Sequence, residues 1–324
     1  MIENKRILIL GGTGSLGNAL VEKYLEKNLL FAFSRSENTQ WLMKQKFSLE
    51  KNYVNLKFLI GDIKDKERVK TCIFETKPNI ILICAAMKQI DTCEEFVSEC
   101  VNTNIIGVRN VIDVIYEASQ IGTVPHLETV IFISTDKACS PVSSYGMAKA
   151  ISERLIIEKS QFVQSPKFVN VRYGNVLSSR GSIFPFYKNI VESKDEKRYF
   201  PVTDPKMTRF FMTLSQSTDL IEYAILNGKS GDTIIPKSIN SYKILDIATA
   251  FSNKYNIPIK ETGIRQGEKL HETLINYTES LRTIEKDNYY IIKPSYHRVT
   301  TSVNFSQNEY VSSNLVGDIN ELPI

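Results

Sequence analysis

The sequence has no stretch approaching the ~20 consecutive apolar residues that a membrane-spanning helix needs. Before Gly11 its N-terminus has a four-residue apolar run, which is too short for a secretory signal peptide. It also lacks a stripe of basic residues with interleaved aromatic residues, and its formal net charge is only +4. These absences predict a soluble, cytoplasmic protein that binds neither a membrane nor a nucleic acid.

The cysteine residues lack the paired spacing that is typical of metal sites, and their number is odd. Such a set is typical of buried thiols in a reducing compartment, so we expect no metal site. Low-complexity segments and repeats of fixed period are also missing. The five residues are Cys72, Cys84, Cys93, Cys100 and Cys139.

The first half of the sequence alternates short apolar runs with helical patterns. With 324 residues, 42% of them hydrophobic, the chain can form one large core and a smaller lobe. Apolar runs of this kind predict strands covered on both faces, and their alternation with helices predicts an α/β fold with a doubly wound parallel sheet of the Rossmann type. The expected strands are 6–10, 29–34, 55–60, 79–86, 129–135 and 168–174, and the expected helices are 16–28, 65–75, 101–119 and 143–160.

The pattern changes after residue 175, where prolines separate shorter apolar pieces. We therefore expect a dinucleotide-binding domain over residues 1–175 and a smaller, less regular substrate lobe over residues 176–324, although parts of the chain can cross back. Residues 276–324 are polar and predict an extension that wraps the surface. The prolines are Pro185, Pro201, Pro205 and Pro236, and the helices expected in the lobe are 214–226 and 242–255.

A glycine-rich segment, GGTGSLG, follows the first expected strand and opens the first helix. Glycine is needed where the backbone turns tightly and approaches a pyrophosphate, and a helix N-terminus offers free N–H groups there. A glycine triplet alone is weak support, but its position between a strand and a helix favours a dinucleotide site. The residues expected to contact the dinucleotide are Gly11, Thr13, Gly14, Ser15, Leu16 and Gly17.

The end of the second expected strand bears on which dinucleotide binds. An NAD enzyme usually has Asp or Glu there, which accepts from the ribose 2′-hydroxyl. This chain has Ser34 and Arg35, and an arginine can pair with a 2′-phosphate, so we predict NADP. The alternative is that Arg35 is a solvated surface residue and that NAD binds through other contacts, and Glu37 nearby leaves this open.

Residues after the third and fourth expected strands are candidates for contact with the same cofactor. Asp62 could accept from the adenine amino group while Ile63 lies against the ring; alternatively, Asp62 or Asp65 caps a helix. Ala85 and Ala86 are small enough to let the backbone lie close to the cofactor, although small residues at a strand end also serve packing.

A Tyr-x-x-x-Lys pair, Tyr145 and Lys149, lies on one of the expected helices, so the two side chains share a face. A nearby ammonium favours the phenolate and should lower the phenol pKa from its usual value of ~10. The phenolate can then take a proton from a sugar hydroxyl during hydride transfer to a nicotinamide. Thr135, at the end of the fifth expected strand, could contact the same oxygen. The alternative is an amphipathic helix with a half-buried tyrosine and a solvated lysine.

A set of motifs resembles the extended short-chain dehydrogenases/reductases, and specifically the UDP-N-acetylglucosamine 4,6-dehydratases that invert C5. The resemblance extends over about residues 5–293. Its later motifs are much more specific than the glycine segment. The motifs are GGTGSLG, GDIKD, AAMK, STDKACSP, YGMAK, RYGNVLSSRGS, MTRF and IRQGEKLHE.

The resemblance implies an enzyme in which two sets of groups transfer protons. The family oxidises C4 of the sugar, which acidifies the C5 proton. A base removes that proton, and an acid protonates the departing C6 hydroxyl. The resemblance implies that Tyr145, helped by Lys149, acts at C4, that Asp136 is the acid at C6, and that Lys137 is the base at C5.

An ordinary lysine is protonated at neutral pH, so Lys137 needs a desolvated or cation-rich pocket, to which Lys88 and Lys149 could contribute. The alternative reading is a helix-start carboxylate beside a solvated lysine.

The resemblance also implies a UDP-sugar substrate, NADP as cofactor and a homo-oligomer, either a dimer or a hexamer. Arginine suits diphosphate oxygens and a carboxylate can accept from ribose hydroxyls, although a single arginine is more often a solvated charge. A retaining 4,6-dehydratase or a C4 epimerase on the same fold remains the alternative function. The implied substrate-binding residues are Lys88, Tyr173, Asn175, Ser179, Arg180, Arg209, Arg265 and Glu268, and Lys88 is also expected near the cofactor.

Overall fold

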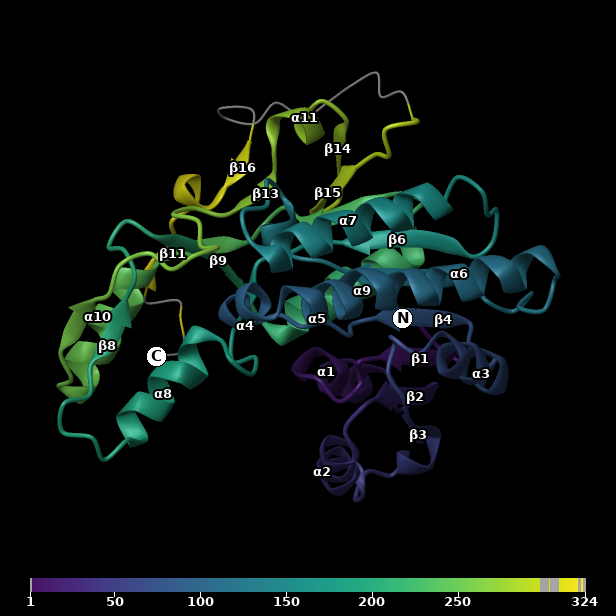
Figure 1. Ribbon diagram of the computed structural model, residues 1–324, viewed down its shortest axis with the longest axis horizontal. Coiled ribbons are helices and arrows are strands. Elements are labelled where there is room, and N and C mark those ends of the chain that lie inside the picture. The colour runs from purple at the N-terminus through teal and green to yellow at the C-terminus, as the bar shows by residue number, and fades with distance from the viewer. Residues whose placement is uncertain (1, 298–302, 304–308, 320–321, 323–324) are drawn as a thin grey trace.

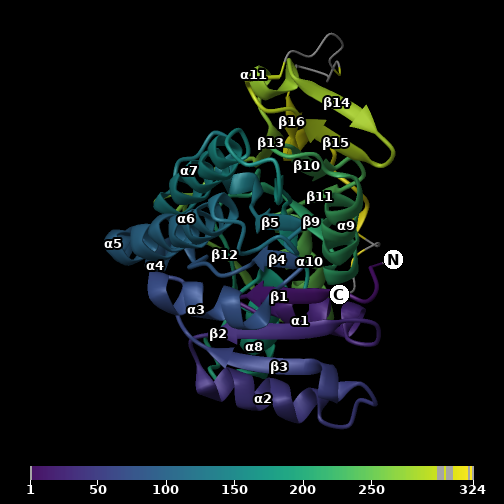
Figure 2. The same cartoon turned by 90° about the vertical axis from the view of Figure 1, so that its right-hand side faces the viewer.

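The apolar runs form the strands of one central sheet (Figures 1 and 2). The computed structural model describes residues 2–297, 303, 309–319 and 322. Within them, the largest sheet has the strand order β14-β15-β10-β6-β5-β4-β1-β2-β3. Its strands are β1 (Arg6–Leu10), β2 (Leu29–Ser34), β3 (Leu56–Ile60), β4 (Ile80–Ile83), β5 (Thr129–Ile133), β6 (Lys167–Val171), β10 (Thr233–Pro236), β14 (Thr283–Lys286) and β15 (Tyr289–Ile292).

The sheet is parallel from β3 to β10 and ends in the antiparallel pair β15 and β14. Helices cover both faces, so the doubly wound parallel fold predicted from the sequence is confirmed (Figure 2). Strand β1 shows why its apolar run is continuous: Ile7 and Ile9 pack on one face, and Leu8 and Leu10 pack on the other. The first face carries α1 (Ser15–Tyr24), α2 (Glu37–Phe47) and α9 (Leu214–Asn227), and the second carries α3 (Lys66–Thr76), α6 (Gly107–Gln120) and α7 (Ser144–Lys159).

A smaller lobe lies beside the carboxyl ends of the parallel strands (Figure 1). Its core is aromatic: the rings of Tyr187, Phe200 and Phe251 contact one another, and Phe184 contacts Phe251. The lobe contains β7 (Asn175–Val176), β9 (Thr208–Met212) and β11 (Asn240–Lys243) in one sheet, β8 (Phe200–Val202) and β12 (Ile259–Glu261) in another, and helices α8 (Ile183–Glu192) and α10 (Ile244–Tyr255).

The remaining elements are short. They are η1 (Tyr53–Asn55), α4 (Ile90–Glu95), α5 (Val97–Val101), a π-helical segment (Asn102–Ile106), the 3-10 turn η3 (Asp136–Ala138), β13 (Thr273–Ile275), α11 (Tyr277–Ser280), β16 (Tyr310–Val311) and the 3-10 turn η5 (Ser312–Asn314). Among the described residues, no helix has both the length and the apolar character needed to cross a membrane.

The segment after residue 275 differs from the expected surface-wrapping extension. Strands β14 and β15 continue the central sheet next to β10, and Ile291 and Ile292 on β15 are buried. β16 pairs with β13, next to the loop that carries Glu272. The remainder of that expected extension, residues 298–302, 304–308, 320–321 and 323–324, lies outside the described residues.

A buried ion-pair network joins the end of β6 to the segment after β13. Arg172 is 2% exposed and donates to Glu153 of α7 at 2.6 Å and to Glu279 of α11 at 2.8 Å. Burial raises the pKa of Glu279, but the charge of Arg172 outweighs it and brings the value to about 2. Arg172, the first residue of the motif RYGNVLSSRGS, therefore holds the two parts of the chain together.

We expect the substitution Arg172→Met to lower the free energy of unfolding by about 3–5 kcal/mol, because it leaves two buried carboxylates without their cation. Urea denaturation measures this effect. The matched control is Arg109→Met, since Arg109 pairs with Asp113 on the surface of α6 and should contribute less than about 1 kcal/mol. Equal losses in the two variants would show that the network adds no special stability.

Candidate active site

A cavity of about 1100 Å³ lies where the parallel strands end and the smaller lobe begins. It has polar and apolar walls, as expected for a site that holds a cofactor and a substrate together. With one exception, the residues predicted to form the site line this cavity. They are Gly11, Thr13, Gly14, Ser15, Leu16, Gly17, Ser34, Arg35, Asp62, Ile63, Ala85, Ala86, Lys88, Thr135, Lys137, Tyr145, Lys149, Tyr173, Asn175, Ser179, Arg180, Arg209, Arg265 and Glu268.

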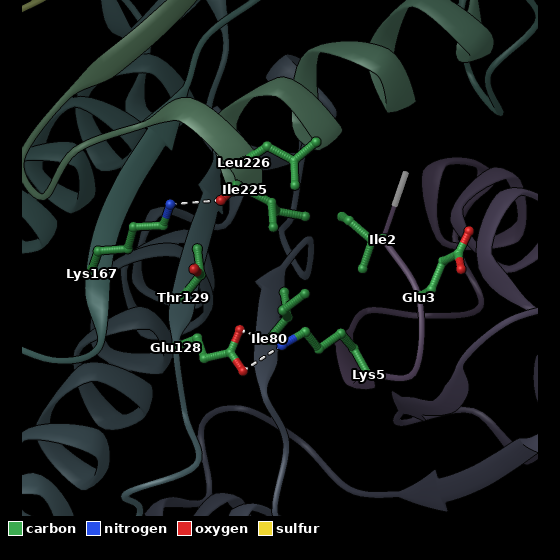
Figure 3. Close-up of a pocket in the computed structure, with 9 residues that line it drawn as sticks. All are labelled: Ile2, Glu3, Lys5, Ile80, Glu128, Thr129, Lys167, Ile225 and Leu226. Carbon is green, nitrogen blue, oxygen red and sulfur yellow. Dashed lines mark hydrogen bonds and ion pairs between the residues drawn. The ribbon is translucent and has the colours of Figure 1, made fainter.

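A second cavity of about 410 Å³ lies at the opposite end of the strands, where β4, β5 and β6 begin (Figure 3). Its charged groups already have partners: Lys5 pairs with Glu128 at 2.6 Å, and Lys167 donates to the carbonyl oxygen of Ile225 at 2.6 Å. None of the predicted site residues lines it. The first cavity is therefore the candidate active site.

The glycine-rich loop is shaped for a close backbone approach. Gly11 has a φ of +87°, and a Cβ atom on Gly17 would lie 2.1 Å from the carbonyl oxygen of Gly12. Helix α1 follows with Gly14 as its N-cap and no side-chain cap, so its first-turn N–H groups stay available to a ligand. This combination fits the pyrophosphate of a dinucleotide.

The side chains expected around the adenosine lie together at the ends of β2 and β3. Arg35 Nη1 is 3.7 Å from Asp62 Oδ2, and the Arg35 side chain is 58% exposed, which leaves it free to meet a further anion. The helix cap that could have explained Asp62 belongs to Asp65, which accepts from the backbone N–H of Arg68 at the start of α3. Asp62 therefore remains on the cavity wall.

Tyr145 and Lys149 share one face of α7, but their electrostatics differ from the expectation. Burial raises the pKa of Tyr145 to about 12, while the charge of Lys137 and a hydrogen bond with Thr135 oppose the rise. Lys149 lies 4.0 Å from the centre of the Phe132 ring, and burial lowers the pKa of Lys149 to about 8. The charge of Lys137 thus acts on the phenol, which the sequence did not suggest.

Lys137 is held at the cavity wall by three oxygen atoms. Its Nζ lies 3.1 Å from Oδ1 of Asp136, 3.2 Å from Oδ1 of Asn175 and 3.2 Å from Oε1 of Glu272. Burial lowers the pKa of Lys137, but the two carboxylates outweigh this and raise it to about 12. Lys137, which was expected to be a neutral amine, is therefore an ammonium here. Arg209, and not the expected Lys88 or Lys149, is the nearby cation that lowers its pKa.

Asp136 is the one predicted site residue that does not line the cavity. It is fully buried behind Thr135 and Lys137, and its Oδ1 accepts from the Thr135 hydroxyl at 3.0 Å. Burial raises the pKa of this carboxyl, against the charge of Lys137. A proton on Asp136 can therefore reach the cavity through either of the two neighbours that face it.

The expected substrate-binding residues come from four segments: Lys88 follows β4 of the central sheet, and the others belong to three segments of the smaller lobe and its connections. Arg180 crosses to the glycine-rich loop, where its guanidinium donates to the carbonyl oxygen of Thr13 at 2.6 Å. Arg265 pairs with Glu268 at 2.6 Å and with Asp91 of α4 at 2.7 Å, so it connects the two sides of the mouth. Asp91 was not anticipated, because nothing in the sequence connects it to a residue 174 positions away.

Glu272 is the other residue that the sequence analysis missed. It ends the motif IRQGEKLHE, lies 1% exposed behind Lys137, and contacts Arg209 and Lys269 as well. Its position in the motif was the one available signal. Among the described residues, no group of three His, Cys, Asp or Glu side chains could hold a metal ion.

The comparisons with known proteins agree on one family. A family model described as polysaccharide biosynthesis protein matches residues 7–294. The chain is 37% identical over 313 residues to a UDP-N-acetylglucosamine 4,6-dehydratase (inverting) of Campylobacter jejuni, which covers 95% of this chain and 88% of that protein. It is also 36% identical over 303 residues to a UDP-glucose 4-epimerase of Rickettsia bellii, at 90% and 84% coverage.

Two solved structures extend the likeness. Pen from Bacillus thuringiensis has a TM-score of 0.84 at 32% identity and covers 97% of this chain and 95% of its own. The second is the dTDP-glucose 4,6-dehydratase DesIV from Streptomyces venezuelae, which was solved with NAD. Its TM-score is 0.70 at 16% identity, and the match covers 82% of this chain and 86% of that one. At this identity the similarity is one of fold. The chain therefore belongs to the polysaccharide biosynthesis protein family of extended short-chain dehydrogenases/reductases, as its motifs indicated.

Proposed function

We propose that the protein is an NADP-dependent UDP-N-acetylglucosamine 4,6-dehydratase that inverts C5. The product is UDP-2-acetamido-2,6-dideoxy-β-L-arabino-hex-4-ulose, which serves glycan biosynthesis. The observation that carries the proposal is the pair Asp136–Lys137 beside Tyr145, because elimination needs proton-transfer groups beyond those that oxidise C4. The Campylobacter jejuni relatives named for this activity add support.

The cofactor site rests on the fit of the glycine-rich loop and the uncapped start of α1 to a dinucleotide. Arg35 would meet the 2′-phosphate, and Tyr145 and Lys149, which line the cavity, would hold the nicotinamide end. A bound nicotinamide would supply the redox chemistry, which is removal of a hydride from C4 of the sugar and its return to C6.

The first proton transfer belongs to Tyr145. Its phenolate takes the proton of the C4 hydroxyl as the ketone forms, and Thr135 orients the same oxygen. Because burial raises the pKa of Tyr145, the positive charge of Lys137 and the hydrogen bond with Thr135 are what favour the phenolate.

The second and third proton transfers belong to the pair Asp136–Lys137. The C4 ketone acidifies C5. After the Lys137 ammonium passes a proton to Asp136 across their hydrogen bond, the neutral amine of Lys137 takes the C5 proton, and the carboxylic acid of Asp136 supplies the proton with which the C6 hydroxyl leaves as water. A proton then returns to C5 from the opposite face of the ring, which inverts the centre. Asp136 reaches the cavity through Thr135 or Lys137, since both contact its Oδ1 and both face the cavity.

The nucleotide end of the substrate is bound by the arginines of the smaller lobe. Arg180, Arg209 and Arg265 suit the diphosphate, and Glu268 accepts from the ribose hydroxyls. The proposed role of Lys88, Tyr173, Asn175 and Ser179 is to line the sugar position. We also propose a homo-oligomer, dimer or hexamer, supported by the exposed apolar side chains of Val97, Val101, Met147 and Ile151 on the neighbouring helices α5 and α7.

A C4 epimerase is the second candidate, because the Rickettsia relatives of similar identity are named UDP-glucose 4-epimerase. Simple epimerisation at C4 needs no acid at C6 and no base at C5. A buried Asp136–Lys137 pair would then have no chemical use.

Proton NMR of the reaction mixture tests the proposed function. The enzyme is incubated with UDP-N-acetylglucosamine and, separately, with UDP-glucose. We expect a new 6-methyl signal with the first substrate, and we expect it to form faster there than with the second. A C4 epimer with an intact C6 hydroxymethyl group would reject the dehydratase assignment.

The NADP assignment predicts the effect of Arg35→Glu. Removal of the cation and addition of a like charge should weaken NADP binding relative to NAD by roughly 10–100-fold, the range for a lost charge-assisted hydrogen bond. Titration of both cofactors by intrinsic fluorescence measures the ratio. Arg109→Glu, on the surface of α6, is the control for added charge, and an unchanged NADP preference in Arg35→Glu would exclude the assignment.

A further inference from the structure

We propose that Glu272 is a positioning residue that keeps one mobile proton on the pair Asp136–Lys137. This role rests on the proposed function, since it concerns the proton transfers at C5 and C6. Glu272 lies outside the cavity and has no contact with a substrate held there. It acts through Lys137, which it contacts from behind at 3.2 Å.

The charges around Lys137 come from four elements. Asp136 belongs to η3, Arg209 to β9, Tyr145 to α7, and Glu272 to the loop before β13. Glu272 in turn faces Arg209 at 3.6 Å and Lys269 at 3.4 Å. Burial raises the pKa of Glu272, but the three cations outweigh this and bring it to about 2, so it stays ionised.

The ionised cluster holds two carboxylates, Asp136 and Glu272, and three cations, Lys137, Arg209 and Lys269. Loss of one proton therefore makes it neutral. Arginine does not give up its proton, and Lys137, unlike Lys269, both faces the cavity and touches Asp136. The proton that the cluster can move is therefore the one on Lys137.

Transfer of this proton within the pair produces both groups that the elimination needs. The Nζ–H bond of Lys137 breaks and an O–H bond forms on Oδ1 of Asp136, across a hydrogen bond of 3.1 Å. Lys137 becomes a neutral amine that can take the C5 proton, and Asp136 becomes a carboxylic acid that can protonate the C6 hydroxyl. In the described structure, Oδ2 of Asp136 is buried and has no hydrogen-bond partner, which favours the neutral acid.

Glu272 keeps the mobile proton from being lost to solvent, because its negative charge stabilises the ammonium of Lys137. The C-terminal segment fixes Glu272 in place. The backbone N–H of Glu272 donates to Oγ of Ser312 at 2.9 Å, and the N–H of Ser312 donates to the carbonyl oxygen of Glu272 at 2.8 Å. Ser312 also hydrogen bonds Thr208 on β9, next to Arg209.

The test compares Glu272→Gln and Glu272→Asp with the wild-type enzyme, by the rate of 6-methyl formation from pH 7 to about pH 10.5. Each variant rate is divided by the wild-type rate at the same pH, so that titration of Tyr145 and Lys149 largely cancels. Glu279→Gln is the matched control, because Glu279 is also a buried, paired carboxylate but contacts Arg172 instead of Lys137.

Without the charge of Glu272, the pKa of Lys137 should fall by roughly 1–3 units, so the pair loses its proton at lower pH. The rate ratio of Glu272→Gln should then fall by about threefold or more as the pH rises, for a shift of roughly two units. The ratio of Glu272→Asp should fall less, because the charge is kept but lies farther from Lys137. The ratio of Glu279→Gln should stay flat.

Three results would overturn the proposal. A Glu272→Gln ratio that is low but flat would mean a purely structural role. A ratio that rises with pH would mean that Lys137 acts as a lone base. If Glu272→Gln does not fold, the test rests on Glu272→Asp, and a rate ratio of that variant that stays flat with pH contradicts the positioning role. An absence of 6-methyl formation in the wild-type enzyme would reject the proposed function itself, which is a separate outcome.

Discussion

Replacement of Lys137 by alanine should stop deuterium uptake at C5 of the sugar in heavy water and lower the dehydration rate by about three orders of magnitude, within the usual range for a general base. Within the described part of the chain, the substitution removes the one amine that both faces the cavity and touches Asp136. It also leaves the buried carboxylates Asp136 and Glu272 without the cation they share. Proton NMR of the recovered sugar measures the exchange.

The matched control for this variant is Lys159→Ala. Lys159 also lies on a partly buried ion pair, with Asp113 at 3.0 Å, but it is at the far end of α7. It should retain wild-type exchange. Full C5 exchange in Lys137→Ala would exclude Lys137 as the sole base, whereas equal losses in both variants would indicate a general effect of removing a buried lysine.

Tyr145→Phe should lower the rate by a similar factor, roughly 10²–10⁴-fold, but at an earlier step. Only the phenol hydroxyl is removed, so the packing of the ring near Cys93 and Ala148 is kept. Without the proton acceptor at C4 no ketone forms, and without the ketone the C5 proton is not acidic. The variant should therefore neither exchange at C5 nor transfer a deuterium label from C4 to the new methyl group.

The two variants separate the steps in order. Lys137→Ala should still allow oxidation at C4, whereas Tyr145→Phe should allow neither oxidation nor exchange. Tyr116→Phe is the control, because Tyr116 lies on α6 and packs beneath Lys159, away from the cavity. C5 exchange that continues in Tyr145→Phe would show that another group oxidises C4 or that exchange needs no ketone.

The sequence predicted the parallel sheet because buried parallel strands leave continuous apolar runs, as in β1 and β5. It did not predict α2, whose Trp41 and Leu42 are more than half exposed and therefore break the expected apolar stripe. It also did not predict β14 and β15, which are short; β14 forms the edge of the sheet and carries the polar residues Thr283, Glu285 and Lys286. The helix expected at 101–119 contains a π-helical segment at Asn102–Ile106, which apolar periodicity does not reveal.

The residues of the site could be named from motifs, but their charges could not. Lys137 seemed to need a lowered pKa, whereas the structure surrounds it with Asp136 and Glu272 and raises that pKa. The second carboxylate comes from a loop 135 positions away along the chain, so its contact depends on the tertiary fold. Arg172 shows the same limit, since it lies in a family motif and only the fold reveals that it is buried and bonded to Glu279.

The most direct test of the central claim is the wild-type reaction with UDP-N-acetylglucosamine in heavy water, followed by NMR and mass spectrometry. The account predicts loss of one water molecule, a 6-methyl group, one deuterium at C5, and ring couplings of the inverted C5 configuration. A dehydrated product with C5 retained would contradict the inversion, and a C4 epimer without deuterium at C5 would contradict the role of Asp136–Lys137 altogether.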